Sequence, residues 1–243
     1  MKSAPSITIW KDHEAASMAA AHHFVMLCQQ AIAKRGKFTV ALSGGNTPKR
    51  LYELLATKQF SQNIQWKNVL LFWGDERFVA PTDADSNYKM VKEVLLDQID
   101  IPAQNIFPVP TEGKPKAAAK QYEKTIRSLW GKNKIVFDCI LLGIGNDGHT
   151  ASLFPGTNIL KEKKRLIKEV WVEEKKTWRI SFTLPLINDA ANIVLLVTGK
   201  DKAAIFSEIV SGKKKKPLLP VQMIDPVKGN ILWILDEAVT AKI

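Results

Sequence analysis

Short, nearly continuous apolar runs recur along the chain, and most intervals between them are long enough to hold a helix. The runs predicted to be buried strands are residues 38–42, 69–73, 137–142, 193–197 and 231–235. A continuous apolar run is expected where helices cover both faces of a sheet. The alternation of strands and helices therefore predicts an α/β fold, with a mostly parallel, doubly wound sheet and helices on both faces.

Two further segments have a weaker apolar pattern. Residues 170–172 form a short run, and residues 178–184 alternate apolar side chains with Arg179, Ser181 and Thr183. Alternation with a period of two indicates a strand that buries only one face. We therefore expect residues 178–184 to be half exposed or to lie at the edge of a sheet.

Capping residues mark where the intervening helices begin. Asp12 is expected to cap a long helix that ends near Gly36, and Thr47 to cap a helix with Pro48 at its first position. The other predicted helices are one that follows Ser86 and the segments 115–130 and 201–210. Residues 114–134 are polar enough for a peripheral excursion, but no linker or repeat divides the chain. Residues 1–243 are thus expected to form a single domain.

Four of the five predicted strands end in polar clusters, which should converge at one edge of the sheet because parallel strands share a direction. Ser43, Gly44 and Gly45 follow the first strand, and two glycines would let backbone amides approach an anion. A Walker loop is excluded, since no lysine–serine or lysine–threonine pair follows at the required spacing. A tight turn into a helix would explain the same residues without a ligand, so both interpretations stay open.

The second cluster is Asp75, Glu76 and Arg77, three charges directly after a buried strand. They could form an internal ion pair that supports a loop. Alternatively, Arg77 faces an anionic substrate group while a carboxylate assists the chemistry. The third cluster contains Lys202, in a helical first turn where the dipole disfavours a cation unless an anionic partner is present. Arg179, on the polar face of the alternating strand, is a further candidate for a phosphate or carboxylate.

The fourth cluster, residues 143–155, is the most informative stretch of the chain. Asp147 and His149 lie two residues apart on a glycine-containing loop at a predicted strand end, the place where open α/β sheets bind ligands. The other three histidines fall in the N-terminal helical pattern. Imidazole titrates near neutral pH and suits proton transfer, so His149 is a candidate catalytic base.

Composition narrows the class of protein. The 243 residues are 46% hydrophobic and 24% charged, and no apolar run approaches the roughly 20 residues that span a bilayer. No signal peptide is apparent, and Cys28 and Cys139 lack metal-type spacing, so we expect a cytoplasmic protein. The net charge of +11 suits nucleic acid or an anionic ligand, but the densest basic run, residues 213–216, has no interleaved aromatics and is expected to be a solvated loop.

Taken together, these motifs resemble the 6-phosphogluconolactonases, within the wider group that includes glucosamine-6-phosphate deaminase. The resemblance rests on residues 43–48, 74–77, 143–155, Arg179 with its following strand, and 198–203, in matching order. It implies a modified Rossmann-like sheet and hydrolysis of 6-phospho-D-glucono-1,5-lactone in the pentose phosphate pathway, a carboxylic ester hydrolase reaction.

The deaminases are the main alternative within that group. Their motif runs on to an Asn-Glu-Pro ending that supplies a catalytic glutamate, whereas Phe154 precedes Pro155 here. Deaminases also carry a tyrosine where this chain has Arg77. Both departures favour the lactonases. A sugar-phosphate-binding regulator is disfavoured by retention of Asp147 and His149, and a nucleic-acid binder is supported only by charge.

The resemblance also assigns expected roles. His149 would be the general base, oriented by Asp147, and Asp75 is a third candidate catalytic residue. Arg77 would serve either the oxyanion or the phosphate. The expected phosphate cradle is Ser43, Gly44, Gly45, Arg179 and Lys202. The expected partner is a small sugar phosphate, with no cofactor, metal, nucleic acid or membrane, and a monomer is favoured over an oligomer.

Overall fold

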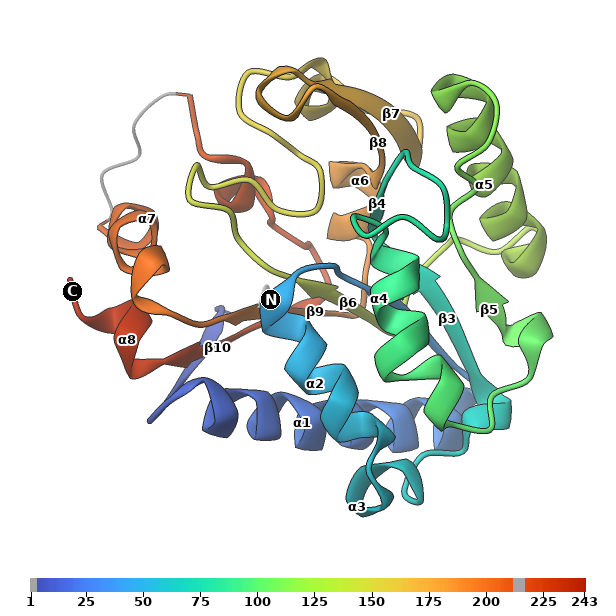
Figure 1. The fold of residues 1–243 in the computed structure, drawn as a ribbon, viewed down its shortest axis with the longest axis horizontal. Coiled ribbons are helices and arrows are strands. Elements are labelled where there is room, and N and C mark those ends of the chain that lie inside the picture. Colours follow the sequence, from blue (N-terminus) through green and yellow to red (C-terminus); the bar gives the residue numbers. More distant parts are fainter. Residues whose placement is uncertain (1–3, 212–216) are drawn as a thin grey trace.

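Seven parallel strands form the central sheet of the computed structural model, which describes residues 4–211 and 217–243 (Figure 1). Their order is β1-β10-β9-β6-β2-β3-β5, and every neighbouring pair is parallel. The strands are β1 (Ser6–Trp10), β2 (Phe38–Leu42), β3 (Val69–Trp73), β5 (Ile106–Phe107), β6 (Cys139–Leu142), β9 (Asn192–Val197) and β10 (Asn230–Asp236). The predicted doubly wound α/β fold is confirmed.

The strand order reverses between β2 and β6. From β2 the chain winds outward through β3 to β5, and from β6 it winds the other way through β9 to β10. In such sheets a crevice opens beyond the carboxyl ends of the strands at the reversal. The four predicted strands with polar ends, β9, β6, β2 and β3, are consecutive neighbours across this point.

Helices cover both faces of the sheet (Figure 1). They are α1 (His13–Arg35), α2 (Asn46–Ala56), α3 (Lys58–Ser61), α4 (Asn87–Val94), α5 (Pro115–Trp130), α6 (Leu184–Asn188), α7 (Ala203–Val210) and α8 (Glu237–Thr240). On one face α1 contacts β2, β10 and α2, and the Phe24 ring of α1 packs edge-on against Phe38. On the other face Phe72 of β3 contacts Trp130 of α5. Helix α5 also packs against β7 and β8.

Of the three predicted helix caps, two are confirmed and one is corrected. Asp12 accepts a hydrogen bond from the Ala15 amide at 2.9 Å, and Ser86 accepts one from Lys89 at 3.2 Å. Thr47, however, does not cap α2, because the helix begins at Asn46, two residues before the predicted first position at Pro48. The reason is Gly45, whose φ of 104° turns the chain into the helix before Thr47 is reached. The segment expected to be helical from residue 201 likewise begins as a 3₁₀ turn, Lys200–Lys202, before α7.

A second sheet, which the sequence pattern did not predict, carries part of the candidate site. It has the antiparallel order β4-β8-β7, with β4 at Asp75–Arg77, β7 at Ile167–Val172 and β8 at Thr177–Phe182. The expectation of an edge or half-exposed strand at residues 178–184 is therefore wrong beyond its first residues. β8 is the central strand, and its polar Ser181 is buried like its apolar neighbours.

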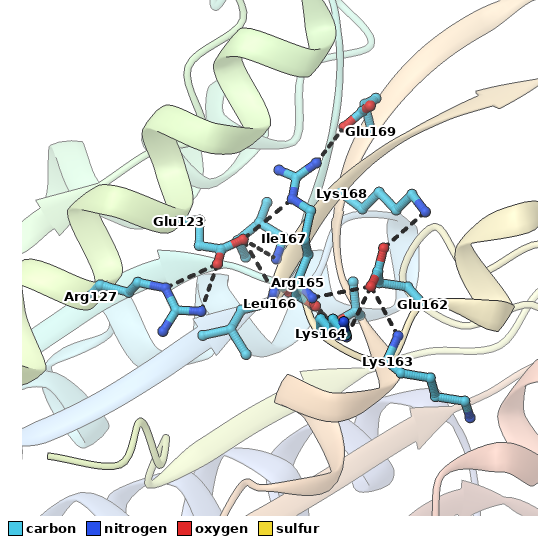
Figure 2. A network of polar contacts seen from close by, with 11 residues as sticks. Glu123, Arg127, Glu162, Lys163, Lys164, Arg165, Leu166, Ile167, Lys168 and Glu169 are labelled. Carbon is cyan, nitrogen blue, oxygen red and sulfur yellow. Dashed lines mark hydrogen bonds and ion pairs between the residues drawn. The ribbon is translucent and has the colours of Figure 1, made fainter.

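A polar network ties α5 to the chain segment that leads into β7 (Figure 2). Glu123 of α5 accepts hydrogen bonds from the amides of Leu166 and Ile167 and pairs with Arg127. Glu162 accepts from three successive amides, Lys163 to Arg165, and from the Lys168 ammonium at 3.0 Å. These donors, the Lys164 amide first, lower the pKa of Glu162 to about 2.

Glu162→Gln should make the protein less stable at neutral pH. It should also reduce the loss of unfolding free energy as the pH falls below 4.5. A carboxyl with a lowered pKa stabilises the fold above its ordinary pKa of 4.5, and this contribution is lost as the pH falls toward 2. We expect a loss at pH 7 of about 1 kcal/mol or less, since the pair is partly screened by water. Urea unfolding from pH 7 to pH 2 measures this. Glu174→Gln, which changes an exposed carboxylate, is the matched control; equal behaviour of the two variants would contradict the prediction.

Candidate active site

The polar strand ends meet around two adjoining cavities. The first, of about 120 Å³, is called here the His149 compartment; its lining residues are Ser43, Gly44, Asp75, Arg77, Asn87, Gly143, Ile144, Gly145, His149, Thr150, Ala151 and Arg179. The second, of about 330 Å³, is the Lys202 compartment; its lining residues are Gly44, Gly45, Asn46, Thr47, Pro48, Gly143, Ile144, Leu196, Val197, Thr198, Asp201 and Lys202. Gly44, Gly143 and Ile144 line both, so the two compartments share a wall at the reversal of strand order.

His149 is held by its neighbour Asp147, although residues two apart can meet only if the loop bends back. The loop bends back so that Asp147 Oδ1 lies 2.5 Å from His149 Nδ1 and 3.1 Å from the His149 amide nitrogen. Partial burial by itself raises the pKa of Asp147, but the hydrogen bonds and charge of His149 outweigh it and lower that pKa. An ionised Asp147 favours the tautomer with the proton on Nδ1, which leaves Nε2 free to accept a proton.

Gly145 makes room for this imidazole. A Cβ at residue 145 would lie 2.1 Å from His149 Nδ1 and 2.7 Å from Asp147 Oδ1, which no side chain can tolerate. The Gly145 amide also donates to the His149 carbonyl at 2.8 Å and so closes the loop. The glycine is thus required by the packing of the Asp147–His149 pair itself.

Phe154 packs against both the imidazole and an arginine. Its ring stacks on that of His149 with centroids 4.1 Å apart and an interplanar angle of 24°. The Arg179 guanidinium carbon lies 5.7 Å from the centre of the same ring. Sequence reasoning used Phe154 only as the sign of a missing glutamate. In the structure it also fixes the faces of two candidate site residues.

Asp75 is buried, and its partners come from distant parts of the chain. Its Oδ2 accepts from the Ser152 hydroxyl at 2.5 Å, which links β4 to the His149 loop. Its carbonyl accepts from the Asn87 side-chain amide at 3.0 Å. That amide group lies against Gly44, where a Cβ would be only 1.8 Å from Asn87 Oδ1. Gly44 therefore has a packing reason to be glycine besides the expected approach to an anion.

Glu76 has a structural role at the start of α4, unlike its neighbours Asp75 and Arg77. Its carboxylate accepts from the amides of Arg77, Asn87 and Tyr88 and so anchors the start of α4. Burial raises the pKa of Glu76 to about 7 in spite of these donors. Its partners are thus mainly backbone amides rather than a cation. Asp75 and Arg77, in contrast, both line the His149 compartment.

Two arginines are placed side by side by the second sheet. Arg77 of β4 lies directly opposite Arg179 of β8 in the antiparallel register. Arg77 donates to the Asp85 carbonyl, but the buried Nε atoms of both arginines have no protein partner. Burial lowers the pKa of Arg179, and the charge of Asp75 partly offsets this lowering. Adjacent guanidinium groups with unused donors are suited to an anionic or developing negative group.

The Lys202 compartment has a different set of donors. Lys202 Nζ lies 2.6 Å from Asn146 Oδ1 and 3.2 Å from Asp201 Oδ2. The first turn of α2, with Asn46 and Thr47, lines the same cavity and has no side-chain cap. Uncapped helix N-termini present amide donors and a positive dipole to anions.

All predicted site residues except Asp147 line one or both of the two cavities. Ser43, Asp75, Arg77, His149 and Arg179 line the His149 compartment, whereas Gly45 and Lys202 line the other. Arg179 and Lys202, expected to form one cradle, line different compartments. Residues that sequence reasoning missed are Asn87, Thr150, Ala151, Ile144, Thr47 and Thr198. Thr47 and Thr198 lie inside the motifs already singled out, but Asn87 follows no strand and carries no sequence signal.

Further expectations concern metal ligands, membrane-spanning helices, the two cysteines and the lysine run. Among residues 4–211 and 217–243, no three His, Cys, Asp or Glu side chains cluster as metal ligands would. In the same residues, no helix combines the length and apolarity needed to cross a bilayer. Cys28 and Cys139 are free and buried. The lysine run 213–216 lies outside the described residues.

Comparison with known proteins identifies the family of this chain. The model of the family described as glucosamine-6-phosphate isomerases/6-phosphogluconolactonase matches residues 11–233. A 6-phosphogluconolactonase of Synechocystis sp. is 43% identical over 212 residues, which are 86% of this chain and 85% of the relative. The solved structure of 6-phosphogluconolactonase from Trypanosoma brucei has a TM-score of 0.86 and 29% identity, and the match covers 97% of each chain.

A monomeric glucosamine-6-phosphate deaminase has nearly the same backbone, with a TM-score of 0.83, 20% identity and coverage of 98% of this chain and 100% of that one. At that identity the likeness shows the fold alone, so the backbone does not separate the two activities. The match over residues 11–233 and the relatives at about 40% identity decide the family. The chain belongs to the family of glucosamine-6-phosphate isomerases and 6-phosphogluconolactonases.

Proposed function

We propose that the chain hydrolyses 6-phospho-D-glucono-1,5-lactone to 6-phospho-D-gluconate, the lactonase step of the pentose phosphate pathway. The observation that carries the proposal is the Asp147–His149 pair, in which His149 borders a cavity with two arginines at the reversal of strand order. Relatives at 40–43% identity named 6-phosphogluconolactonase support the same substrate. We take residues 1–243 to act as one lactonase domain, as a cytoplasmic monomer.

The first step adds water to the lactone carbonyl. His149 Nε2 takes a proton from the attacking water, while Asp147 holds Nδ1–H and stabilises the imidazolium that forms. A carbon–oxygen bond forms and the carbonyl oxygen becomes an oxyanion. Arg77 lines the same cavity and offers positive charge to that oxygen. Asp75, fixed by Ser152, adds negative charge near Arg179.

The second step opens the ring. The tetrahedral intermediate collapses, the bond from the carbonyl carbon to the ring oxygen breaks, and the imidazolium returns its proton to that oxygen. The products are a carboxylic acid, which ionises at neutral pH, and a free hydroxyl. All proton transfers are assigned to His149, so this sequence of steps needs neither a serine nucleophile nor a metal-bound water.

The phosphate is assigned to the wall that the two compartments share. Gly44 on that wall and Gly45 in the Lys202 compartment offer backbone amides, the uncapped start of α2 adds its dipole, and Lys202 supplies a full charge. Arg179, which lines the His149 compartment, is assigned to the same phosphate. In this arrangement the lactone carbonyl lies near His149 and the phosphate toward Lys202, with Ser43 at the loop between them.

An assay of the purified protein on the phosphorylated lactone tests the proposal. We expect hydrolysis well above the spontaneous rate, unchanged after treatment with EDTA and not increased by added divalent ions. Activity that disappears with the chelator and returns with a metal ion would refute the metal-free mechanism. No hydrolysis above the spontaneous rate would refute the proposed function.

The deaminase alternative predicts a different product. We expect no ammonia from glucosamine 6-phosphate, because Phe154 stacks on His149 at the position where the deaminase motif carries its catalytic glutamate. A coupled glutamate dehydrogenase assay measures ammonia, with an authentic deaminase as the positive control. Ammonia release comparable with lactone hydrolysis would overturn the assignment.

A further inference from the structure

A chain of hydrogen bonds leads from the first residue of α1 to the Lys202 compartment. His13 Nδ1 lies 2.9 Å from Thr198 Oγ1, and Thr198 Oγ1 lies 3.3 Å from Thr47 Oγ1. The three residues come from the starts of α1 and α2 and from the residue after β9. Thr47 and Thr198 line the compartment, whereas His13 lies behind them.

The hydroxyl protons decide in which direction these hydrogen bonds run. Each threonine has one hydroxyl proton, so a series in which every hydroxyl both accepts and donates along the line can run in two directions. If Thr47 donates to Thr198 and Thr198 to His13, the Thr47 proton is directed away from the cavity. If His13 Nδ1–H donates to Thr198 and Thr198 to Thr47, the Thr47 proton is left for a further acceptor. An anion in the compartment requires a donor and therefore selects the second direction.

We propose that His13 is a positioning residue for the anionic end of the substrate. The proposal rests on the lactonase function proposed above. His13 Nδ1–H donates to Thr198 Oγ1, the Thr198 hydroxyl donates to Thr47 Oγ1, and the Thr47 hydroxyl donates to the phosphate beside Lys202. His13 acts through the two threonines and does not touch the substrate.

The surroundings of His13 favour this role over a purely structural one. Asp12 already caps α1, so the imidazole is not needed to satisfy the first amides of that helix. The side chain is only partly buried and forms no part of the hydrophobic core. Asp236, which accepts from the amide of Gly199 at 2.9 Å and from the amide of Val239 at the start of α8, has partners other than His13. The contact with Thr198 links α1 to the wall of the compartment.

Replacing His13 should weaken binding of the phosphorylated lactone without slowing the chemistry. We expect His13→Ala to raise KM for the phosphorylated lactone about 3- to 10-fold, the worth of one hydrogen bond in the chain, with kcat nearly unchanged. Hydrolysis of unphosphorylated gluconolactone should not change. His13→Asn should restore most of the KM, since its amide nitrogen takes the place of Nδ1, whereas His13→Gln should not. His22→Asn, on the same helix outside both compartments, is the matched control.

Variants of the two threonines test whether His13, Thr198 and Thr47 act as one hydrogen-bonded unit. Thr198→Val and Thr47→Val should each raise KM at least as much as His13→Ala, and the serine variants should not. Combining His13→Ala with Thr47→Val should add little beyond Thr47→Val alone, because the last donor is already lost. Fully additive effects, or equal losses on both lactones, would overturn the proposal. So would a His13→Ala variant with unchanged KM, or folded His13→Asn and His13→Gln variants that cannot be told apart.

Calorimetric titration with inorganic phosphate separates this proposal from the proposed function. It measures the same anion contact without turnover, so it remains informative if the wild-type protein does not hydrolyse the lactone. We expect His13→Ala to weaken phosphate binding by a similar factor and His13→Asn to restore it. Unchanged phosphate affinity in His13→Ala would refute the role of His13, whatever the outcome of the lactonase assay.

Discussion

His149→Ala is expected to lower kcat for the phosphorylated lactone by about 10²- to 10⁴-fold, the usual contribution of a positioned acid–base group. Without the imidazole no group takes the proton of the attacking water or returns it to the ring oxygen. KM should change much less, because His149 acts mainly in the transition state. Asp147→Asn should give a smaller loss of the same kind, since it removes the charge that favours Nδ1–H but leaves the ring in place.

The measurement must follow the initial rate and subtract spontaneous opening of the lactone, which sets the lowest kcat that can be detected. Circular dichroism and a thermal melt show whether the variant is folded. His23→Ala, which removes a histidine of α1 that lies outside both compartments, is the matched control. A folded His149→Ala protein with near-normal kcat would remove His149 from the mechanism.

Lys202→Ala and Arg179→Ala are expected to cost about 10- to 150-fold each in kcat/KM, as the loss of a charge-assisted hydrogen bond implies. For Lys202 the loss should appear mainly in KM, because the phosphate does not change during the reaction and its contacts are common to ground and transition states. The preference for phosphorylated over unphosphorylated gluconolactone should narrow in both variants. Arg179 shares its compartment with His149 and stacks near Phe154, so its loss should also lower kcat.

Steady-state kinetics on both lactones separates these effects. Lys200→Ala, which removes an exposed lysine two residues from Lys202, is the matched control and should behave like the wild type. If a variant loses activity equally on the two lactones with KM unchanged, its residue does not contact the phosphate. That outcome for Arg179 alone would place the phosphate entirely in the Lys202 compartment.

The α/β class and the converging strand ends could be predicted because their signals are local. Continuous apolar runs identified β2, β3, β6, β9 and β10, since a strand covered on both faces has no polar side. In β1 the polar Ser6 and Thr8 interrupt the apolar side chains, and β5 is only two residues long, so neither carries that signal. The start of α2 was misplaced because a positive φ at Gly45 ended the turn before Thr47.

What the sequence by itself determined was the alternation of strands and helices, the clustering of polar groups at four strand ends, and the Asp147–His149 pair, whose partners are two residues apart. Only the tertiary structure decided which distant groups meet. It placed Arg77 opposite Arg179, put Asn87 against Gly44, and brought His13 to Thr198. The physical reason is that periodicity and capping depend on a few neighbouring residues, whereas these contacts depend on strand order and on the pairing of segments far apart in the chain.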